Sequence, residues 1–223
     1  RERRAAQALF VSEAFNTIAG YGANGAIVHY APPAEGSATI GRDELLLLDS
    51  GAQYLDGTTD ITRTTILGSA TAQERRDYTL VLKGHLALSM IPFPSGTTGH
   101  QLDPLARRHL WEELADYGHG TGHGVGHFLN VHEGPQKISP KYLGVAIDAG
   151  MVLSNEPGIY RRGEYGIRIE NLVVVEEAGE GGFGPFLRFE TVTLFPYERK
   201  LIDPALLSRE EIAWVDGYHE RVF

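Results

Sequence analysis

A glycine- and histidine-rich stretch, residues 118–135, limits what this chain can fold into more than any other part of it. Four of the nine histidines lie within fourteen residues of this stretch, and glycine occupies every second position over half of it. Glycine at this density loses much backbone entropy on folding and offers no side chain to pack, so the stretch suits neither a core helix nor a core strand. It suits a backbone that approaches something closely while imidazoles project from it. A flexible loop with solvated histidines is the alternative, and acidic partners elsewhere in the chain would decide against it.

The composition of the 223-residue chain is that of an ordinary globular protein, with 42% hydrophobic and 22% charged residues. The net charge of −9 argues against nucleic acid as a partner. No apolar run approaches the ~20 residues of a membrane span, and nothing at the start reads as a signal peptide, so we expect a cytoplasmic protein with no membrane partner. Cysteine is absent, so carboxylates and imidazoles must bind any metal. Such ligands favour manganese, with zinc and cobalt as alternatives.

The order of expected elements indicates one α+β domain over residues 1–223. The chain starts as if inside a helix, and residues 1–18 are expected to form one amphipathic helix that is truncated at its beginning. Strand-like and helical segments then alternate, with no linker that would divide them. Strands are expected at 26–30, 44–49, 58–67, 151–156, 166–175 and 187–195, and helices at 71–90, 102–117 and 209–222.

Two aspartates mark a predicted hairpin in the first half of the domain. Asp49 ends a leucine run typical of a buried strand, and Asp60 lies on the β-branched strand after the turn signal Asp56-Gly57. With Asp56-Gly57 as a two-residue turn, Asp60 pairs with Gln53, and both aspartates lie on one face of the sheet. They would then be ~13 Å apart along the strands. A bulge or bend at Ser50-Gly51 would be needed to bring them together, and the alternative is a turn acid and an unrelated surface acid.

Two glutamates in the second half are placed more favourably. Glu156 and Glu170 lie symmetrically about Gly163, which sits in a good turn, so antiparallel strands would bring their Cβ atoms ~5 Å apart. Facing carboxylates repel each other unless a cation neutralises them or both are fully solvated. The residues around both glutamates are mostly apolar or small, so a metal ion is the natural cation there. Arg168, two residues from Glu170 on the same face, could neutralise the glutamates in place of a metal ion, which is the purely structural alternative.

Four carboxylates and an imidazole together are typical of a dinuclear metal site. Bridging carboxylates hold two ions ~3.5–4 Å apart, and such a pair generates a hydroxide at neutral pH that can attack an amide bond. Further histidines would orient the carbonyl and stabilise the tetrahedral intermediate. The glycine run does not match GxGxxG, and GxxxxGK(S/T) is absent, so phosphate binding has no support. Gly-x-Ser-x-Gly is absent too, which leaves a serine hydrolase without its nucleophile turn.

Five separated motifs, in order along the chain, resemble the metallopeptidases of the pita-bread fold. They are most similar to the catalytic domain of the aminopeptidase P (Xaa-Pro aminopeptidase) family of the larger, three-domain type. The resemblance implies a curved antiparallel sheet with helices packed outside, and two further domains before this one. The motifs are LDSG at 48–51 with TDITRT at 59–64, HGTGHGVG at 119–126, NVHEGP at 130–135, NEPGIY at 155–160 and GIRIEN at 166–171.

The same resemblance implies a set of metal ligands, which are Asp49, Asp60, His123, Glu156 and Glu170. Asp60 and Glu170 would bridge two divalent ions. Asp49 would complete the coordination of one ion, and His123 with Glu156 that of the other. Glu156 would also be the general base for the bridging water. The ions implied are two Mn²⁺, with Zn²⁺ or Co²⁺ as alternatives.

Other residues match positions that handle the substrate or surround the metal ligands in this family: His29, His119, His132, Tyr160 and Arg168. His29 and His132 match histidines with a part in catalysis, and His119 matches one near the pocket for the proline ring. Arg168 would orient a ligand rather than replace a cation. The alternating glycines would leave room for a peptide backbone. His127 departs from the family pattern, which has a small residue there, and we interpret it as a surface histidine.

The function that the resemblance implies is a metal-dependent exopeptidase. It would hydrolyse the N-terminal Xaa-Pro bond of peptides with proline in second position, using a metal-bridging hydroxide as nucleophile. A prolidase, which cleaves Xaa-Pro dipeptides only, is one alternative. A metal-free pita-bread binding module, as in some histone chaperones, is another, although such lineages lose ligands and all five are present here. A homodimer also stays open, with part of its contact outside this sequence.

Overall fold

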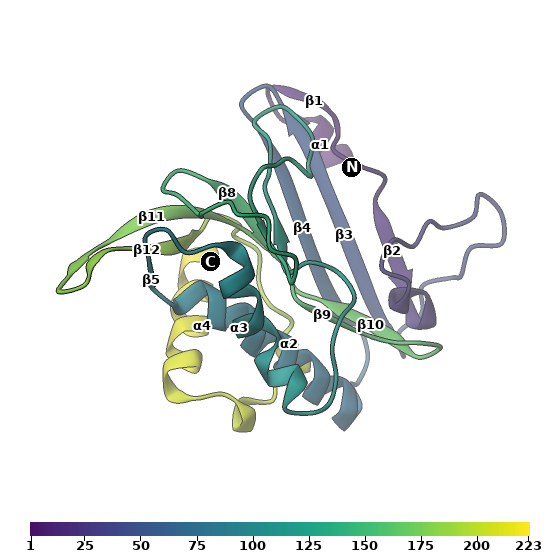
Figure 1. The fold of residues 1–223 in the computed structure, drawn as a ribbon. Coiled ribbons are helices and arrows are strands. Elements are labelled where there is room, and N and C mark those ends of the chain that lie inside the picture. Colours follow the sequence, from purple (N-terminus) through teal and green to yellow (C-terminus); the bar gives the residue numbers. More distant parts are fainter.

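The computed structural model describes residues 1–223 and forms a curved system of antiparallel strands with helices packed on one side of it (Figure 1). This is the predicted α+β, pita-bread arrangement. The strands are β1 (Phe10–Glu13), β2 (Ile18–Tyr21), β3 (Leu45–Tyr54), β4 (Gly57–Ile66), β5 (Phe93–Pro94), β6 (Gly122–His123), β7 (Lys137–Ile138), β8 (Val152–Asn155), β9 (Gly158–Arg161), β10 (Tyr165–Arg168), β11 (Asn171–Gly181) and β12 (Gly184–Thr191). The helices are α1 (Glu2–Ala5), α2 (Ala72–Met90), α3 (Gly99–Trp111) and α4 (Arg209–Val222), with 3-10 turns η1 (Gly22–Ala26), η2 (Arg199–Leu201) and η3 (Pro204–Leu206).

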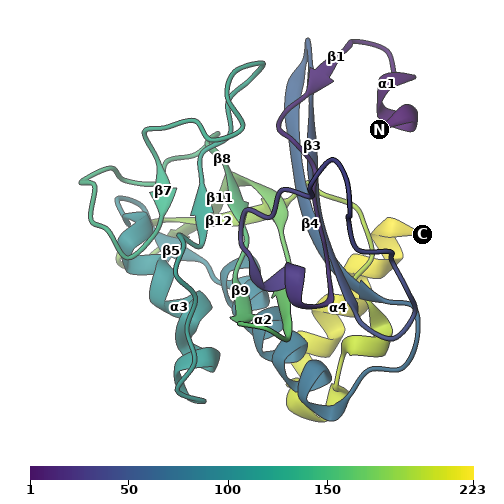
Figure 2. The same cartoon turned by 90° about the vertical axis from the view of Figure 1, so that its right-hand side faces the viewer.

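Two four-stranded antiparallel sheets make up the frame. In the first, β3 pairs with β4 along one edge and with β1 and β2 along the other. In the second, the strand order is β5-β12-β11-β8. The ladder of β9 with β10 and the short ladder of β6 with β7 complete the strand system. Figure 2 shows β7 and β8 on one side and β3 and β4 on the other, with α2, α3 and α4 gathered below them.

Helix α2 connects two hydrophobic clusters that form the core. Its middle, from Tyr78 to Leu86, packs with residues of β3, β10, α3 and α4, and Leu88 in its last turn packs with α3 and the second sheet. The helix begins where the sequence predicts because Thr71 and Glu74 form reciprocal capping hydrogen bonds. None of the helices combines the length and hydropathy that a membrane span requires. The largest fully buried apolar side chains include Leu45, Tyr78, Leu82, Leu86, Leu110 and Leu153.

The prediction of a single helix over residues 1–18 is wrong. Helix α1 covers four residues only, β1 lies within the same range, and β2 begins at its last residue, Ile18. Both strands pair with β3, and Ile18 lies directly opposite Asp49. A long strand with a free edge offers backbone partners that an isolated amphipathic helix lacks, so sheet pairing overrides the helical pattern.

Several other boundaries differ from the sequence-based expectation. Helix α3 ends at Trp111 and not at residue 117, β3 continues to Tyr54, and the strand predicted at 187–195 is β12 at Gly184–Thr191. Residues 26–30 are not a strand, because η1 occupies their start and the Tyr30 N–H donates to the Ile27 carbonyl in a turn (3.0 Å). Helix α3 starts earlier than predicted, because Gln101 Oε1 accepts from the Thr98 N–H and caps the helix there (2.9 Å). The predicted strand 166–175 is divided between β10 and β11. Helix α4 has the bounds predicted for it.

Candidate metal centre and active site

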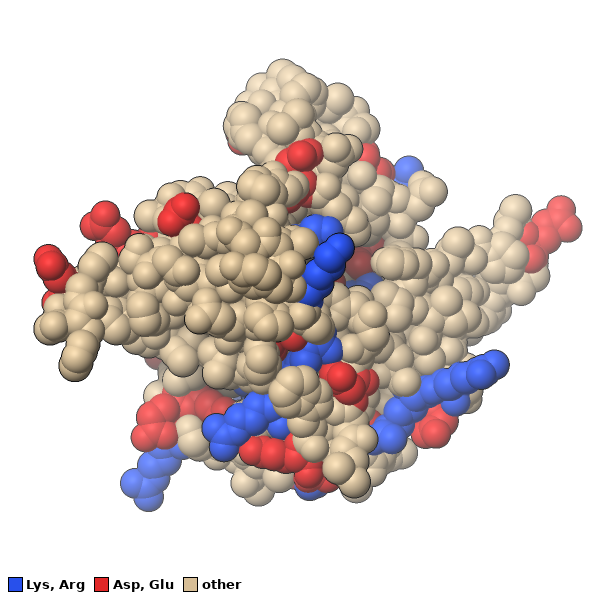
Figure 3. Space-filling model, viewed as in Figure 1, with Lys and Arg blue, Asp and Glu red and all other residues tan.

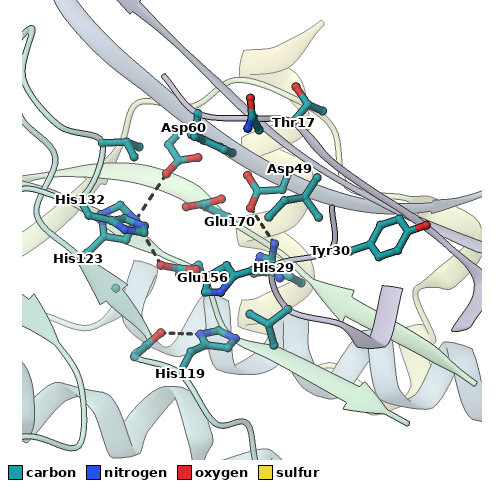
Figure 4. Close-up of a pocket in the computed structure, with 18 of the residues that line it drawn as sticks. Thr17, His29, Tyr30, Asp49, Asp60, His119, His123, His132, Glu156 and Glu170 are labelled. Atoms are coloured by element: carbon teal, nitrogen blue, oxygen red, sulfur yellow. Dashed lines mark hydrogen bonds and ion pairs between the residues drawn. The ribbon is translucent and has the colours of Figure 1, made fainter. Parts of the chain in front are cut away.

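One cavity of about 920 Å³ receives all five side chains that the sequence predicts as metal ligands: Asp49, Asp60, His123, Glu156 and Glu170. They come from β3, β4, β6 and the two junctions that follow β8 and β10. In Figure 4 these side chains converge on one centre. The cavity is also lined by His29, His119, His132 and Arg168. Tyr160 lies outside the lining and contacts His119 and Arg168.

The β3–β4 hairpin brings the two aspartates closer together than the sequence suggests. The turn is formed by Leu55-Asp56, so Asp60 pairs with Gly51 and not with Gln53. Asp49 therefore lies only two positions away along β3, about 7 Å by strand geometry. The predicted separation was wrong because the turn lies one residue earlier than the Asp-Gly signal indicates. The shared face was predicted correctly, since the pairing shifts by two positions, and the ladder needs no bulge.

The two glutamates lie opposite each other, as their symmetry about Gly163 predicts. Asn155 pairs with Asn171 on one side of them and Gly158 with Arg168 on the other, which keeps one register throughout. At the glutamates themselves the ladder is interrupted. The backbone N–H of Glu156 donates to the Thr121 carbonyl (2.7 Å), and that of Glu170 donates to the Thr62 carbonyl (3.1 Å). The expected single hairpin is thus two ladders, with the carboxylates at the gap between them.

His123 has the tautomer that a metal ligand needs. Its Nδ1 lies 2.8 Å from the Gly124 carbonyl oxygen, to which it donates, so the Nε2 lone pair points into the cavity. Nε2 lies 3.5 Å from Asp60 Oδ2 and 3.4 Å from Glu156 Oε1. Ligand atoms of Asp60, His123 and Glu170 all lie within 4.8 Å of one another. This is the spacing of groups that share one ion.

The charge distribution of the cluster fits divalent cations. The pKa of Glu156 is raised to about 7, chiefly by burial and also by the neighbouring Asp60 and Asp49 carboxylates, against the opposing effect of His123 and Arg168. Burial and the same like charges raise the pKa of Glu170 well above its ordinary value. Asp49 Oδ1 and Asp60 Oδ1 are buried without a hydrogen-bond partner. Buried, unpaired carboxylate oxygens of this kind are costly unless a cation binds them, so the residues fit the expected pair of ions.

Without metal, the Glu156 carboxylate is expected to make folding less favourable as the pH rises. Its pKa is about 7 in the folded chain against an ordinary 4.5, so between these values the folded state binds more protons than the unfolded state. The free energy of unfolding should therefore fall with rising pH in this window, by at most about 1.4 kcal/mol per pH unit for one proton.

Urea unfolding of the chain and of Glu156→Gln, in chelator from pH 4.5 to 7.5, would measure this contribution as the difference between the two. The difference is needed because burial lowers the pKa of His85 to about 3 and that of His119 to about 4, which gives slopes of opposite sign. A difference that does not change with pH would contradict the prediction.

Arg168 binds the aspartate side of the cluster rather than neutralising the facing glutamates. Its guanidinium donates to Asp49 Oδ2 (2.7 Å) and to the Tyr160 hydroxyl (2.8 Å). The Tyr160 hydroxyl in turn lies 2.8 Å from His119 Nε2. Because His119 Nδ1 donates to the Gly120 carbonyl (2.8 Å), Nε2 is the acceptor and Tyr160 the donor. Burial lowers the pKa of His119 to about 4, so its ring is neutral at pH 7.

Two residues that the sequence analysis missed hold the glutamates in place. The Thr62 hydroxyl donates to Glu170 Oε2 (2.7 Å) and accepts from Arg168 Nε (3.2 Å). The Ser154 hydroxyl donates to Glu156 Oε1 (3.1 Å) and accepts from the His123 N–H (3.0 Å). Each is two residues from a predicted ligand on the same strand, Thr62 after Asp60 and Ser154 before Glu156. That two-residue spacing was a signal that could have identified them.

The remaining histidines of the glycine-rich stretch occupy different positions. The His132 ring packs edge-on against the His123 ring, with centroids 4.2 Å apart. His132 and His29 both line the cavity (Figure 4). His127 is exposed and lies outside the cavity lining, in agreement with a surface histidine.

Two of the alternating glycines, Gly122 and Gly124, accommodate the protein's own backbone. A Cβ atom on Gly122 would lie 2.0 Å from the Ser154 carbonyl oxygen. A Cβ atom on Gly124 would lie 2.1 Å from the Glu133 carbonyl oxygen. Both contacts are far too short for any side chain. Glycine is therefore needed here because β6 is enclosed by neighbouring segments of the same chain.

Two relatives of this chain carry the names of Xaa-Pro aminopeptidases. One from Fusarium vanettenii, named "Probable Xaa-Pro aminopeptidase P", is 55% identical over 226 residues, covering 99% of this chain and 36% of that protein. "Aminopeptidase P1" from Lotus japonicus is 51% identical over 221 residues, covering 98% of this chain and 34% of that protein. These relatives confirm the resemblance to the aminopeptidase P family, and the chain spans about a third of their length.

Solved structures that resemble this chain include an X-prolyl aminopeptidase and a prolidase. An X-prolyl aminopeptidase from Caenorhabditis elegans, described as a cytosolic enzyme with a di-nuclear active site, has a TM-score of 0.95 at 43% identity, over 99% of this chain and 36% of that chain. The prolidase from Pyrococcus furiosus has a TM-score of 0.67 at 35% identity, over 74% of this chain and 47% of that chain.

Family profiles account for nearly the whole sequence. The profile of metallopeptidase family M24 matches residues 1–177, and that of the C-terminal region of peptidase M24 matches residues 185–223. The first match contains the entire carboxylate–histidine cluster, and the second contains α4 and all of β12 except Gly184. The chain therefore belongs to metallopeptidase family M24.

Proposed function

We propose that this chain is the catalytic region of a dinuclear metallo-aminopeptidase that releases the N-terminal residue from peptides with proline in second position. The observation that carries the proposal is the convergence of four buried or half-buried carboxylates and one correctly oriented imidazole on a single cavity. The names of the relatives at 51–55% identity support the proline specificity.

Two divalent ions would be held by Asp49, Asp60, His123, Glu156 and Glu170, as the family resemblance implies. When bound, such ions polarise a carbonyl oxygen and lower the pKa of water toward neutrality. Manganese is the ion we propose, because oxygen ligands outnumber nitrogen ligands four to one in this set, with zinc and cobalt as alternatives.

The chain's own residues supply proton transfer and orientation. Glu156 would accept the proton of the attacking water, and the Ser154 hydroxyl holds one of its carboxylate oxygens in place. His29 and His132 both line the cavity and would contact the peptide. His119, neutral and hydrogen-bonded to Tyr160, would offer its ring to the substrate near the proline.

A peptide-length series tests this specificity in the full chain loaded with Mn²⁺. Xaa-Pro-Xaa tripeptides and longer Xaa-Pro peptides should lose their first residue, and matched Xaa-Ala-Xaa peptides should be cleaved far more slowly. Cleavage of Xaa-Pro dipeptides with none of the longer peptides would contradict an aminopeptidase and favour a prolidase. We also propose a cytoplasmic location, which rests on the description of the nematode relative as cytosolic.

Acidic and basic side chains are interspersed over the face of the molecule shown in Figure 3, with no extended basic surface. Together with the net charge of −9, this distribution favours a small peptide substrate over nucleic acid.

A further inference from the structure

A buried ion pair on α3 lies directly behind the glycine–histidine stretch. Asp103 and Arg107 are one helical turn apart and only 1% and 2% exposed. Arg107 Nε donates to Asp103 Oδ2 (2.6 Å), and Nη2 donates to the backbone carbonyl of His119 (2.6 Å). Nη1 donates to the carbonyl of Tyr117 (2.7 Å), whose ring centroid lies 3.8 Å from the guanidinium carbon. The guanidinium is thus held both by its own helix and by the segment that leads into the site.

Thr121 extends this network to Glu156. Its hydroxyl donates to Asp103 Oδ1 (2.7 Å) and, with its proton engaged there, accepts from the Tyr117 hydroxyl (2.6 Å). The Thr121 side chain is fully buried. Its backbone carbonyl accepts the hydrogen bond from the Glu156 N–H (2.7 Å). One helix therefore holds both ends of the three-residue segment 119–121, and this segment holds Glu156.

We propose that the Asp103–Arg107 pair is a positioning device that sets His119 and Glu156 relative to each other. The inference rests on the proposed function, in which His119 faces the substrate and Glu156 accepts a proton. A buried ion pair adds little net stability compared with apolar residues of similar volume, so stability alone does not account for it. A catalytic group displaced by about 1 Å can lower a rate about 100-fold, which does account for so many fixed contacts behind one segment.

Two branches of the network predict separable kinetic effects in the full chain with saturating Mn²⁺. Thr121→Val keeps the shape of the side chain but removes the hydroxyl, and should lower kcat on an Xaa-Pro tripeptide by about 10- to 100-fold with little change in KM, because Glu156 is displaced. Thr121→Ser restores the hydroxyl and should recover most of that loss. Arg107→Lys loses the Nη2 donor to the His119 carbonyl and should act mainly on KM, raising it several-fold.

The exposed pair Arg108–Glu112 on the same helix provides the matched control. Arg108→Ala should leave kcat, KM and the unfolding midpoint unchanged. A merely structural role for the buried pair would lower the folded fraction and kcat in proportion for Thr121→Val and Arg107→Lys alike, with KM unchanged. That result, or wild-type kinetics in Thr121→Val, would overturn the proposal.

Hydrogen exchange gives a readout that does not depend on activity. Thr121→Val should speed amide exchange in segments 119–123 and 153–158 while α2 and α4 keep wild-type protection, and Thr121→Ser should not. If the wild-type protein is inactive but Thr121→Val shows this local increase in exchange, the proposed function is refuted and the positioning role is supported. Active wild-type protein with unchanged exchange in Thr121→Val would refute the positioning role alone.

Discussion

Replacing Glu156 by glutamine is expected to lower the turnover of an Xaa-Pro tripeptide by about 10²- to 10⁴-fold, the usual contribution of a general base. The amide has the shape of the carboxylate and can still accept from the Ser154 hydroxyl, but it cannot take a proton from water. Burial raises the pKa of Glu156 to about 7, which suits a group that exchanges protons near neutral pH. The chain should still fold, because the change removes one of several mutually repelling charges.

Turnover should be measured at saturating Mn²⁺, with the bound metal counted in each sample, so that loss of chemistry is separated from loss of an ion. Glu164→Gln is the matched control, because Glu164 is exposed at the turn between β9 and β10. It should have wild-type kinetics. A Glu156→Gln variant that kept a tenth or more of wild-type turnover with two ions bound would refute the role assigned to Glu156.

Adding Mn²⁺ to the metal-free chain is expected to raise its thermal unfolding midpoint by roughly 5 to 10 °C for each ion bound at 100 times its Kd. The physical reason is that, without metal, some oxygens of the buried carboxylates lack hydrogen-bond partners and the carboxylates repel one another. Asp49 and Asp60 each keep one buried oxygen without a partner, and burial with like charge raises the pKa of Glu170 well above its ordinary value. A cation would satisfy these oxygens and remove the repulsion at the same time.

Asp60→Asn should abolish most of this response, because Asp60 lies closest to both His123 and the glutamates among the aspartates. The same variant should be no less stable than the wild type in the absence of metal, since one repelling charge is gone. Asp56→Asn, at the exposed turn of the same hairpin, should respond to Mn²⁺ as the wild type does. A wild-type chain that bound less than one ion and showed no shift would favour a metal-free binding module.

The local elements of this fold were largely readable from the sequence. Helices were predicted at 71–90 and 209–222, where α2 and α4 lie, and the facing of Glu156 and Glu170 follows from symmetry about Gly163. These features depend on residues close in sequence, whose geometry local rules describe well. The five candidate ligands were also recognisable, because the motifs that carry them are long and separated.

Other features depend on partners that are distant in sequence, and the sequence analysis did not find them. Residues 10–13 and 18–21 are strands only because β3 presents an edge to them. The register of β3 with β4 was missed by two positions because a one-residue change in the turn is invisible to an Asp-Gly signal. Thr62 acquires its role through a hydrogen bond to Glu170, and Ser154 in part through one from the His123 N–H, and both partners are distant in sequence.

The glycine–histidine stretch separates the two kinds of knowledge most clearly. The sequence by itself determined that a backbone must pass close to something there and that imidazoles must project from it, because glycine removes every Cβ that would interfere. Only the tertiary structure decided that the close neighbours are the chain's own Ser154 and Glu133 carbonyls. It also decided that His123 turns its free nitrogen toward the carboxylates while His127 faces solvent. Orientation of this kind depends on hydrogen bonds and burial between segments far apart in the chain, which no local pattern encodes.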